Sequence, residues 1–121
     1  MAKKILIADD EPEILDFVRT TLEMGGYVVA GISHGGQLPS AIKKEKPDML
    51  ILDVLMPGLD GYSLQLYLSQ QEETKNLPVI VASALPAART LFDKFPQVKM
   101  FVDKPFDPNM LLKKVKEILG E

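Results

Sequence analysis

Five polar side chains follow short apolar runs along the chain, and their types suit chemistry on a shared ligand. They are Asp9 and Asp10 after the run 4–8, Asp53 after 49–52, Ser83 after 79–82 and Lys104 after 100–102. Apolar runs of this length are typical of strands buried on both faces of a parallel sheet. Ligands of such sheets bind at the carboxyl ends of the strands, so we expect the five side chains to gather at one edge.

Three carboxylates at one edge need a compensating cation. Two carboxylates about 4 Å apart repel each other by roughly 4 kcal/mol at an effective dielectric constant near 20. Lys104 offers one positive charge, and a divalent metal ion would add two. The metal ligands would all be oxygen atoms, which favours Mg²⁺. A Mg²⁺ ion, an ammonium group and a hydroxyl around one carboxylate, Asp53, are the groups needed for phosphoryl transfer to that carboxylate.

Each of these side chains also has an ordinary structural role open to it. Asp10 could cap the start of a helix, and Asp53 could brace the following turn by accepting backbone N–H bonds. Asp9 and Lys104 could be solvated, and Ser83 could cap a turn. Each role is common by itself, but no structural task brings all five side chains to one edge, which favours the chemical interpretation.

The elements that must position these side chains alternate along the chain. Strands are expected at 4–8, 27–31, 49–52, 79–82 and 100–102, and helices at 12–24, 38–46, 62–71, 87–95 and 108–119. Five strand–helix units, (βα)5, predict an α/β fold, a flavodoxin-like doubly wound five-stranded parallel sheet of order 2-1-3-4-5. In this order the strands before Asp9, Asp53 and Ser83 are neighbours, and the strand before Lys104 lies beyond Ser83.

Composition limits the class of protein further. The chain has 121 residues, of which 46% are hydrophobic, a net charge of −3 and no cysteine. This size suits one domain, residues 1–121, and the charge gives no general attraction to nucleic acid or to an anionic membrane. The lack of cysteine excludes disulfides and zinc–thiolate sites. No stretch approaches the ~20 apolar residues of a membrane helix, and no signal peptide core is present, so we expect a cytoplasmic domain, alone or cut from a longer protein.

Four motifs occur in a fixed order along the chain. They are ILIADDEP (5–12), PDMLILDVLMPGLDG (47–61), LPVIVASA (77–84) and VDKPF (102–106). Together they resemble the receiver domain of two-component response regulators, and the match spans nearly the whole chain. The sequence departs from the family at 85–96, where prolines bound a short fourth helix. No particular dimer or effector interface is therefore carried over.

The resemblance implies a role for each residue of the site. Asp53 resembles the aspartate that takes a phosphoryl group from a phosphohistidine, and Lys104 the lysine that pairs with that group. Asp10 resembles a direct Mg²⁺ ligand, Asp9 one that acts largely through water, and the backbone carbonyl of Leu55 a further contact to the metal, to which Asp53 also binds.

The resemblance also implies a conformational switch. Ser83 resembles the hydroxyl that moves to bond the phosphoryl oxygen, Ala84 the small residue that leaves room at the site, and Phe101 the aromatic that follows this movement. Phosphorylation would then change the surface of the fourth helix, fifth strand and fifth helix. The implied partners are a sensor histidine kinase or phosphotransfer protein and an unknown effector, with no direct contact to nucleic acid or membrane. The Lys104–Pro105 bond resembles a cis peptide bond.

Other functional classes remain open beside this switch. A receiver-fold domain that docks without taking phosphate is disfavoured because the five site residues are intact. A Mg²⁺-dependent phosphohydrolase is disfavoured because no second acid lies two residues after Asp53. A flavodoxin-like cofactor site is disfavoured because no glycine-rich phosphate loop follows the first strand. We therefore expect no enzyme beyond a domain that catalyses its own phosphorylation and slow dephosphorylation.

Overall fold

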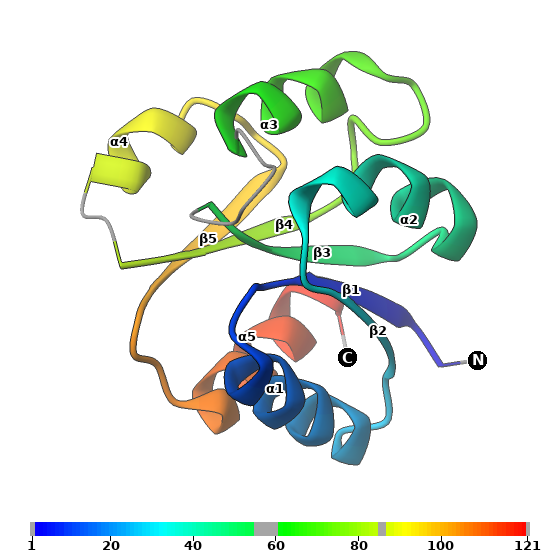
Figure 1. Ribbon diagram of the computed structural model, residues 1–121, viewed down its shortest axis with the longest axis vertical. Coiled ribbons are helices and arrows are strands. Elements are labelled where there is room, and N and C mark those ends of the chain that lie inside the picture. Colours follow the sequence, from blue (N-terminus) through cyan, green and yellow to red (C-terminus); the bar gives the residue numbers. More distant parts are fainter. Residues whose placement is uncertain (1, 55–60, 85–86, 121) are drawn as a thin grey trace.

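The computed structural model describes residues 2–54, 61–84 and 87–120. Within these residues strands and helices alternate as the sequence predicts (Figure 1). The elements are β1 (Lys4–Ala8), α1 (Pro12–Met24), β2 (Val28–Ile32), the 3-10 helix η1 (Gly35–Gln37), α2 (Leu38–Glu45), β3 (Met49–Asp53), α3 (Gly61–Gln70), β4 (Val79–Ser83), α4 (Ala87–Phe92), β5 (Val98–Asp103) and α5 (Pro108–Leu119).

The strands form one parallel sheet in the order β2-β1-β3-β4-β5, which confirms the predicted topology. In register, Ile7 lies beside Ile51, Ile51 beside Ile80, and Ile80 beside Met100. Figure 1 shows α1 and α5 on one face of the sheet and α2, α3 and α4 on the other. Because all strands are parallel, their carboxyl ends lie at the same edge of the sheet.

Two apolar layers, one on each face of the sheet, pack the helices against the strands. Leu50 and Leu52 of β3 pack into the layer shared with α2, α3 and α4, whereas Met49 and Ile51 pack into the layer shared with α1 and α5. All five residues of β3 are buried. A strand covered on both sides has no polar face, which is why its sequence is a continuous apolar run.

Helix ends follow from local chemistry. Asp107 caps α5, where its side chain accepts a hydrogen bond from the backbone N–H of Asn109 at 2.9 Å, and Gly120 ends the helix with φ of 77°. The sequence predicts a left-handed glycine after α1 as well. Gly25 remains right-handed with φ of −81°, and Gly26 takes the positive φ of 99°.

Around α4 and β5 the element boundaries differ from the prediction. Helix α4 ends at Phe92 and not at Phe95, and β5 begins at Val98 and not at Met100. Phe92 and Phe95 are buried, and each ring packs edge-on against Tyr62, with centroids 6.1 and 5.8 Å away. Burying both rings favours a turn after Phe92, which helical periodicity alone does not reveal.

A buried amide pair joins α3 to the turn before β5. Gln65 donates from Nε2 to Oε1 of Gln97 at 2.8 Å. Gln97 in turn donates to the carbonyl oxygens of Thr74 and Leu77 at 2.9 and 2.8 Å. Only 4% of Gln97 is exposed. These bonds tie the segment after α3 to the start of β5.

No helix among the described residues combines the length and the apolar character needed to cross a membrane.

Candidate functional site

The carboxyl edge of the sheet carries the predicted side chains. Asp53 and Ser83 are the last residues of β3 and β4, Asp9 follows β1, and Lys104 follows β5. Asp9, Asp53 and Ser83 are only 4%, 3% and 4% exposed. Acidic and polar groups this deeply buried need partners, because an unpaired buried charge is strongly unfavourable.

Lys104 supplies the partner for several acids. Its Nζ donates to Oδ2 of Asp9 at 2.9 Å, to Oε1 of Glu11 at 3.0 Å and to Oδ2 of Asp53 at 3.0 Å. The backbone places this side chain, because the N–H of Lys104 donates to the carbonyl of Ser83 at 3.1 Å. The Lys104–Pro105 bond is cis, as expected from the sequence. A single ammonium group thus joins residues from both ends of the chain.

The same contacts keep the Lys104 side chain charged. Burial alone lowers the pKa of Lys104, but the hydrogen bonds to Asp9, Asp53 and Glu11, with the charge of Asp53, outweigh it and raise the pKa above its ordinary value of 10.5. The side chain is only 10% exposed. Lys104 is therefore a fixed cation within the acid cluster.

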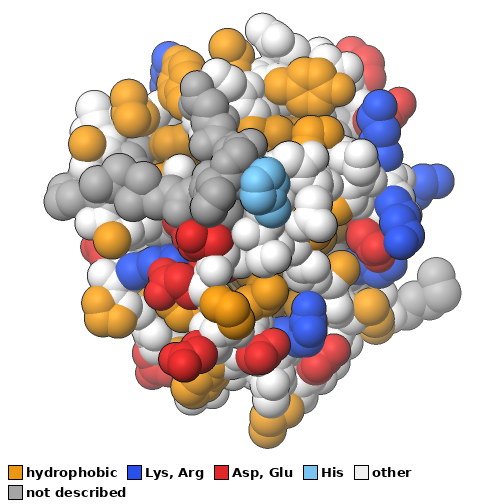
Figure 2. Space-filling view, viewed as in Figure 1, with side chains coloured by type: hydrophobic (Ala, Val, Ile, Leu, Met, Phe, Trp, Pro, Cys, Tyr) orange, Lys and Arg blue, Asp and Glu red, His pale blue; other side chains and the backbone are white. Residues whose placement is uncertain are grey.

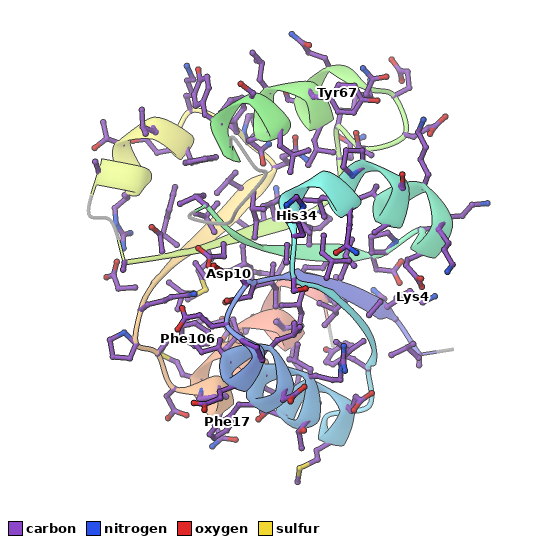
Figure 3. All side chains as sticks on the ribbon, viewed as in Figure 1. Lys4, Asp10, Phe17, His34, Tyr67 and Phe106 are labelled. Atoms are coloured by element: carbon purple, nitrogen blue, oxygen red, sulfur yellow. The ribbon has the colours of Figure 1, made fainter. Side chains whose placement is uncertain are left out.

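The acids outnumber this cation. Asp9, Asp10, Glu11 and Asp53 each present a carboxylate oxygen, and these oxygens all lie within 4.8 Å of one another. Figure 3 labels Asp10 in the loop between β1 and α1. Oxygen-only ligands with excess negative charge suit a hard divalent cation such as Mg²⁺. The residues present therefore fit a metal of this kind.

A backbone contact holds Asp9 in place. Oδ1 of Asp9 accepts a hydrogen bond from the backbone N–H of Glu11 at 2.9 Å, while Oδ2 of Asp9 faces Lys104. Glu11 is the N-cap residue of α1, yet its side chain makes no capping bond. The structural alternative for Asp10 as a helix cap is therefore wrong, because the cap position belongs to the next residue.

The structure brings together most of the residues predicted from the sequence. Asp9, Asp10, Asp53 and Lys104 meet in one cluster. Ser83 is buried at the end of the neighbouring strand, and the residue after it, Ala84, is exposed. Leu55, the predicted carbonyl ligand, lies outside the described residues.

The predicted switch aromatic, Phe101, lies in β5. It is half-buried and packs against the apolar layer on the α2, α3 and α4 face. The guanidinium carbon of Arg89 in α4 lies 5.2 Å from the centre of the Phe101 ring, and Arg89 also reaches Asp103 at 3.8 Å. Phe101 is therefore in contact with α4.

Sequence reasoning missed Glu11. The sequence indicates only an acid at the start of a helix at this position, where a carboxylate is favourable in any case. Its position directly after the Asp9–Asp10 pair was the available signal. The single histidine of the sequence, His34, is exposed in a loop after β2 (Figure 2), and its Nδ1 accepts a hydrogen bond from the backbone N–H of Gly36 at 3.0 Å.

Comparison with known proteins agrees with this geometry. The model of the response regulator receiver domain family matches residues 5–116. Protein PilH of Pseudomonas aeruginosa is 31% identical over 118 residues, which are 97% of this chain and 98% of PilH. The transcriptional regulatory protein PhoP of Bacillus subtilis is 37% identical over 123 residues, 98% of this chain and 49% of PhoP. This chain thus spans about half the length of regulators such as PhoP.

Solved structures give the same result. The chemotaxis response regulator CheY4 of Vibrio cholerae superposes with a TM-score of 0.87 at 26% identity, covering 98% of this chain and 99% of CheY4. The signal receiver domain of a histidine kinase from Syntrophus aciditrophicus gives a TM-score of 0.85 at 31% identity, covering 98% and 91%. The sheet order, the acid cluster and the buried lysine agree with these matches in sequence and structure. This chain therefore belongs to the response regulator receiver domain family, the phosphoacceptor domains of two-component systems.

Proposed function

We propose that Asp53 accepts a phosphoryl group from a phosphohistidine on a sensor histidine kinase or phosphotransfer protein. The observation that carries this proposal is the environment of Asp53. Its carboxylate is nearly buried, bonds to Lys104 at 3.0 Å and belongs to a cluster of four acids within 4.8 Å. Family membership adds support, since receiver domains are phosphoacceptors.

In the proposed reaction, a carboxylate oxygen of Asp53 attacks phosphorus and a P–O bond forms. The P–N bond of the phosphohistidine breaks, and its electron pair stays on the imidazole nitrogen, which takes up a proton. Negative charge spreads over the phosphoryl oxygens in the transition state. Lys104 is placed to donate to one of these oxygens, because its ammonium already lies at hydrogen-bond distance from Asp53.

The acids beside Asp53 are proposed to hold Mg²⁺, with Asp10 as a direct ligand, Asp9 acting largely through water, and Asp53 and the carbonyl of Leu55 completing the protein contacts. The bound ion would neutralise charge on the phosphoryl oxygens. The protein's own part is to hold these acids apart from bulk water while leaving Asp10 half-exposed, where an ion can enter.

The output of this switch is proposed to be the α4–β5–α5 surface. Ser83 and Ala84 stand at the end of β4, and in register Ser83 lies beside Asp103 of β5. Phe101 is two residues earlier on β5 and contacts Arg89 of α4. A movement of the Ser83 hydroxyl toward the phosphoryl group would thus reach α4 through Phe101. The partner that binds this surface is an unknown effector. We propose that residues 1–121 form one cytoplasmic domain, which contacts neither nucleic acid nor membrane.

Intact mass spectrometry tests the phosphoacceptor. The wild type, Asp53→Asn and the matched control Asp16→Asn, an exposed aspartate on α1, are incubated with acetyl phosphate and Mg²⁺. We expect the wild type and the control to gain the mass of one phosphoryl group. Hydroxylamine should remove this group, and chelating the metal beforehand should prevent its addition. A gain in Asp53→Asn, or none in the wild type, would contradict the proposal. The latter result would favour a domain that docks without phosphate.

A further inference from the structure

We infer that Glu11 is a positioning residue that competes with the phosphoryl group for Lys104. In the unphosphorylated protein its carboxylate holds one N–H of the ammonium, and it gives up this contact once Asp53 is phosphorylated. The inference deepens the proposed function and rests on it, because it concerns the same lysine.

The geometry around Lys104 leaves no spare donor. An ammonium group has three N–H donors, and three carboxylates lie at hydrogen-bond distance: Asp9 at 2.9 Å, Glu11 at 3.0 Å and Asp53 at 3.0 Å. The aspartyl phosphate formed at Asp53 is larger and more negative than the carboxylate from which it forms. A phosphoryl oxygen that approaches Nζ of Lys104 therefore comes close to Oε1 of Glu11, which already contacts the same ammonium group.

Charge makes this sharing unfavourable. The phosphoryl group carries about −1.5 to −2, and the Glu11 carboxylate oxygen lies within 4.8 Å of the Asp53 carboxylate in the unphosphorylated structure. Two anions in contact around one ammonium repel each other more strongly than the two carboxylates did. This repulsion favours the departure of whichever carboxylate beside the ammonium is held least firmly.

Burial decides which acceptor leaves. The side chain of Glu11 is 56% exposed, whereas those of Asp9 and Asp53 are 5% and 4% exposed. Asp9 is also held by the backbone N–H of Glu11 at 2.9 Å. The Glu11 carboxylate can turn into water at little cost, since an exposed ion pair contributes about 0–1 kcal/mol. The two aspartates have no such exit.

Glu11 has a second effect with the opposite sign. Its negative charge belongs to the acid cluster that attracts the divalent ion. Removing the charge should weaken Mg²⁺ binding, whereas removing the contact should strengthen binding of a phosphoryl mimic at saturating Mg²⁺. A residue with only a structural role would move both affinities in the same direction.

The test uses two titrations followed by amide chemical shifts in NMR spectra, first Mg²⁺ alone and then beryllofluoride at saturating Mg²⁺. For Glu11→Gln we expect Mg²⁺ affinity to fall by about two- to fivefold and beryllofluoride affinity to rise by about two- to fivefold. Glu11→Asp keeps the charge but shortens the side chain. It should bind Mg²⁺ nearly as the wild type does and bind beryllofluoride more tightly.

The matched control is Glu13→Gln, which removes the same charge from an exposed position in the first turn of α1. We expect it to change both affinities by less than about twofold. Equal or lower beryllofluoride affinity in Glu11→Gln would overturn the inference. If the wild type shows no Asp53-dependent binding of beryllofluoride, the proposed function itself fails, so the two failures are distinguishable.

Discussion

Replacing Lys104 with methionine tests whether its ammonium holds the acid cluster together. Methionine is similar in length and apolar, so the substitution keeps most of the packing and removes the charge. Asp9, Asp53 and Glu11 then lose the group that now lies 2.9–3.0 Å from each. Without a metal ion, we expect the variant to be less stable than the wild type.

The magnitude follows from the burial of the three partners. Removing one member of a buried ion pair costs about 3–5 kcal/mol, and the Asp9 and Asp53 side chains are 5% and 4% exposed. The Glu11 contact is exposed and adds no more than ~0.5 kcal/mol. The neighbouring Asp10 is half-exposed, so solvent at this edge of the sheet can screen part of the cost. We therefore expect a loss of about 3 kcal/mol in the free energy of unfolding, toward the lower end of that range.

A divalent ion should largely reverse this loss. A ligand that binds only the folded state at a hundredfold excess over its Kd stabilises by about 2.7 kcal/mol. In Lys104→Met no ammonium competes for the acids, so Mg²⁺ should bind more tightly to the variant and stabilise it more than the wild type. The gap between the two proteins should therefore shrink as Mg²⁺ is added.

Urea unfolding measures these quantities, once with a chelator and once with saturating Mg²⁺ at matched ionic strength. The control is Lys99→Met, which removes an exposed lysine from β5 and should change the free energy of unfolding by no more than ~0.5 kcal/mol. The reasoning would be refuted if Lys104→Met lay within ~1 kcal/mol of the wild type in chelator. It would also be refuted if Mg²⁺ left the gap unchanged.

Two further predictions concern pH and the buried amide pair. The pKa of Lys104 is raised in the folded state above its ordinary 10.5, so its stabilisation is fully present below that pH and is lost as pH rises through the folded-state value. Unfolding free energies from about pH 8 to about pH 11 should show the wild type losing its advantage over Lys104→Met only at the alkaline end; an advantage that grew there would contradict this sign. Gln97→Leu removes the donor to the carbonyls of Thr74 and Leu77 and the acceptor for Gln65. We expect Gln97→Leu to lower the free energy of unfolding in urea by about 2–4 kcal/mol. The control, Gln37→Leu at an exposed position, should lower it little. Equal losses in the two variants would refute a stabilising role for these hydrogen bonds.

The sheet and most of the site could be predicted from the sequence because burial leaves a strong local pattern. Met49 to Leu52 form a continuous apolar run, and β3 is buried along its whole length. Once the sheet order is known, Asp9, Asp53 and Lys104 must share an edge. The family motifs then imply a role for each of these positions.

The remaining features depend on contacts that no local pattern encodes. Glu11 satisfies the rule for acids at a helix start equally well whether it faces water or Lys104, so its partner becomes visible only after folding. Gln97 follows a proline in a predicted connector, where a polar side chain normally faces water. Its burial depends on Gln65, 32 residues away. The end of α4 depends likewise on where the rings of Phe92 and Phe95 find space.

The bonds of Lys104 have a consequence for how the protein comes into being. They join residues 95, 93 and 51 positions apart. During translation the acids leave the ribosome before their amine does, and a domain generally folds as a unit. A nascent chain that stops short of Lys104 holds its acids without their cation. The acid cluster thus gains its ammonium group only after Lys104 has been synthesised, however much of the strand and helix pattern has already formed.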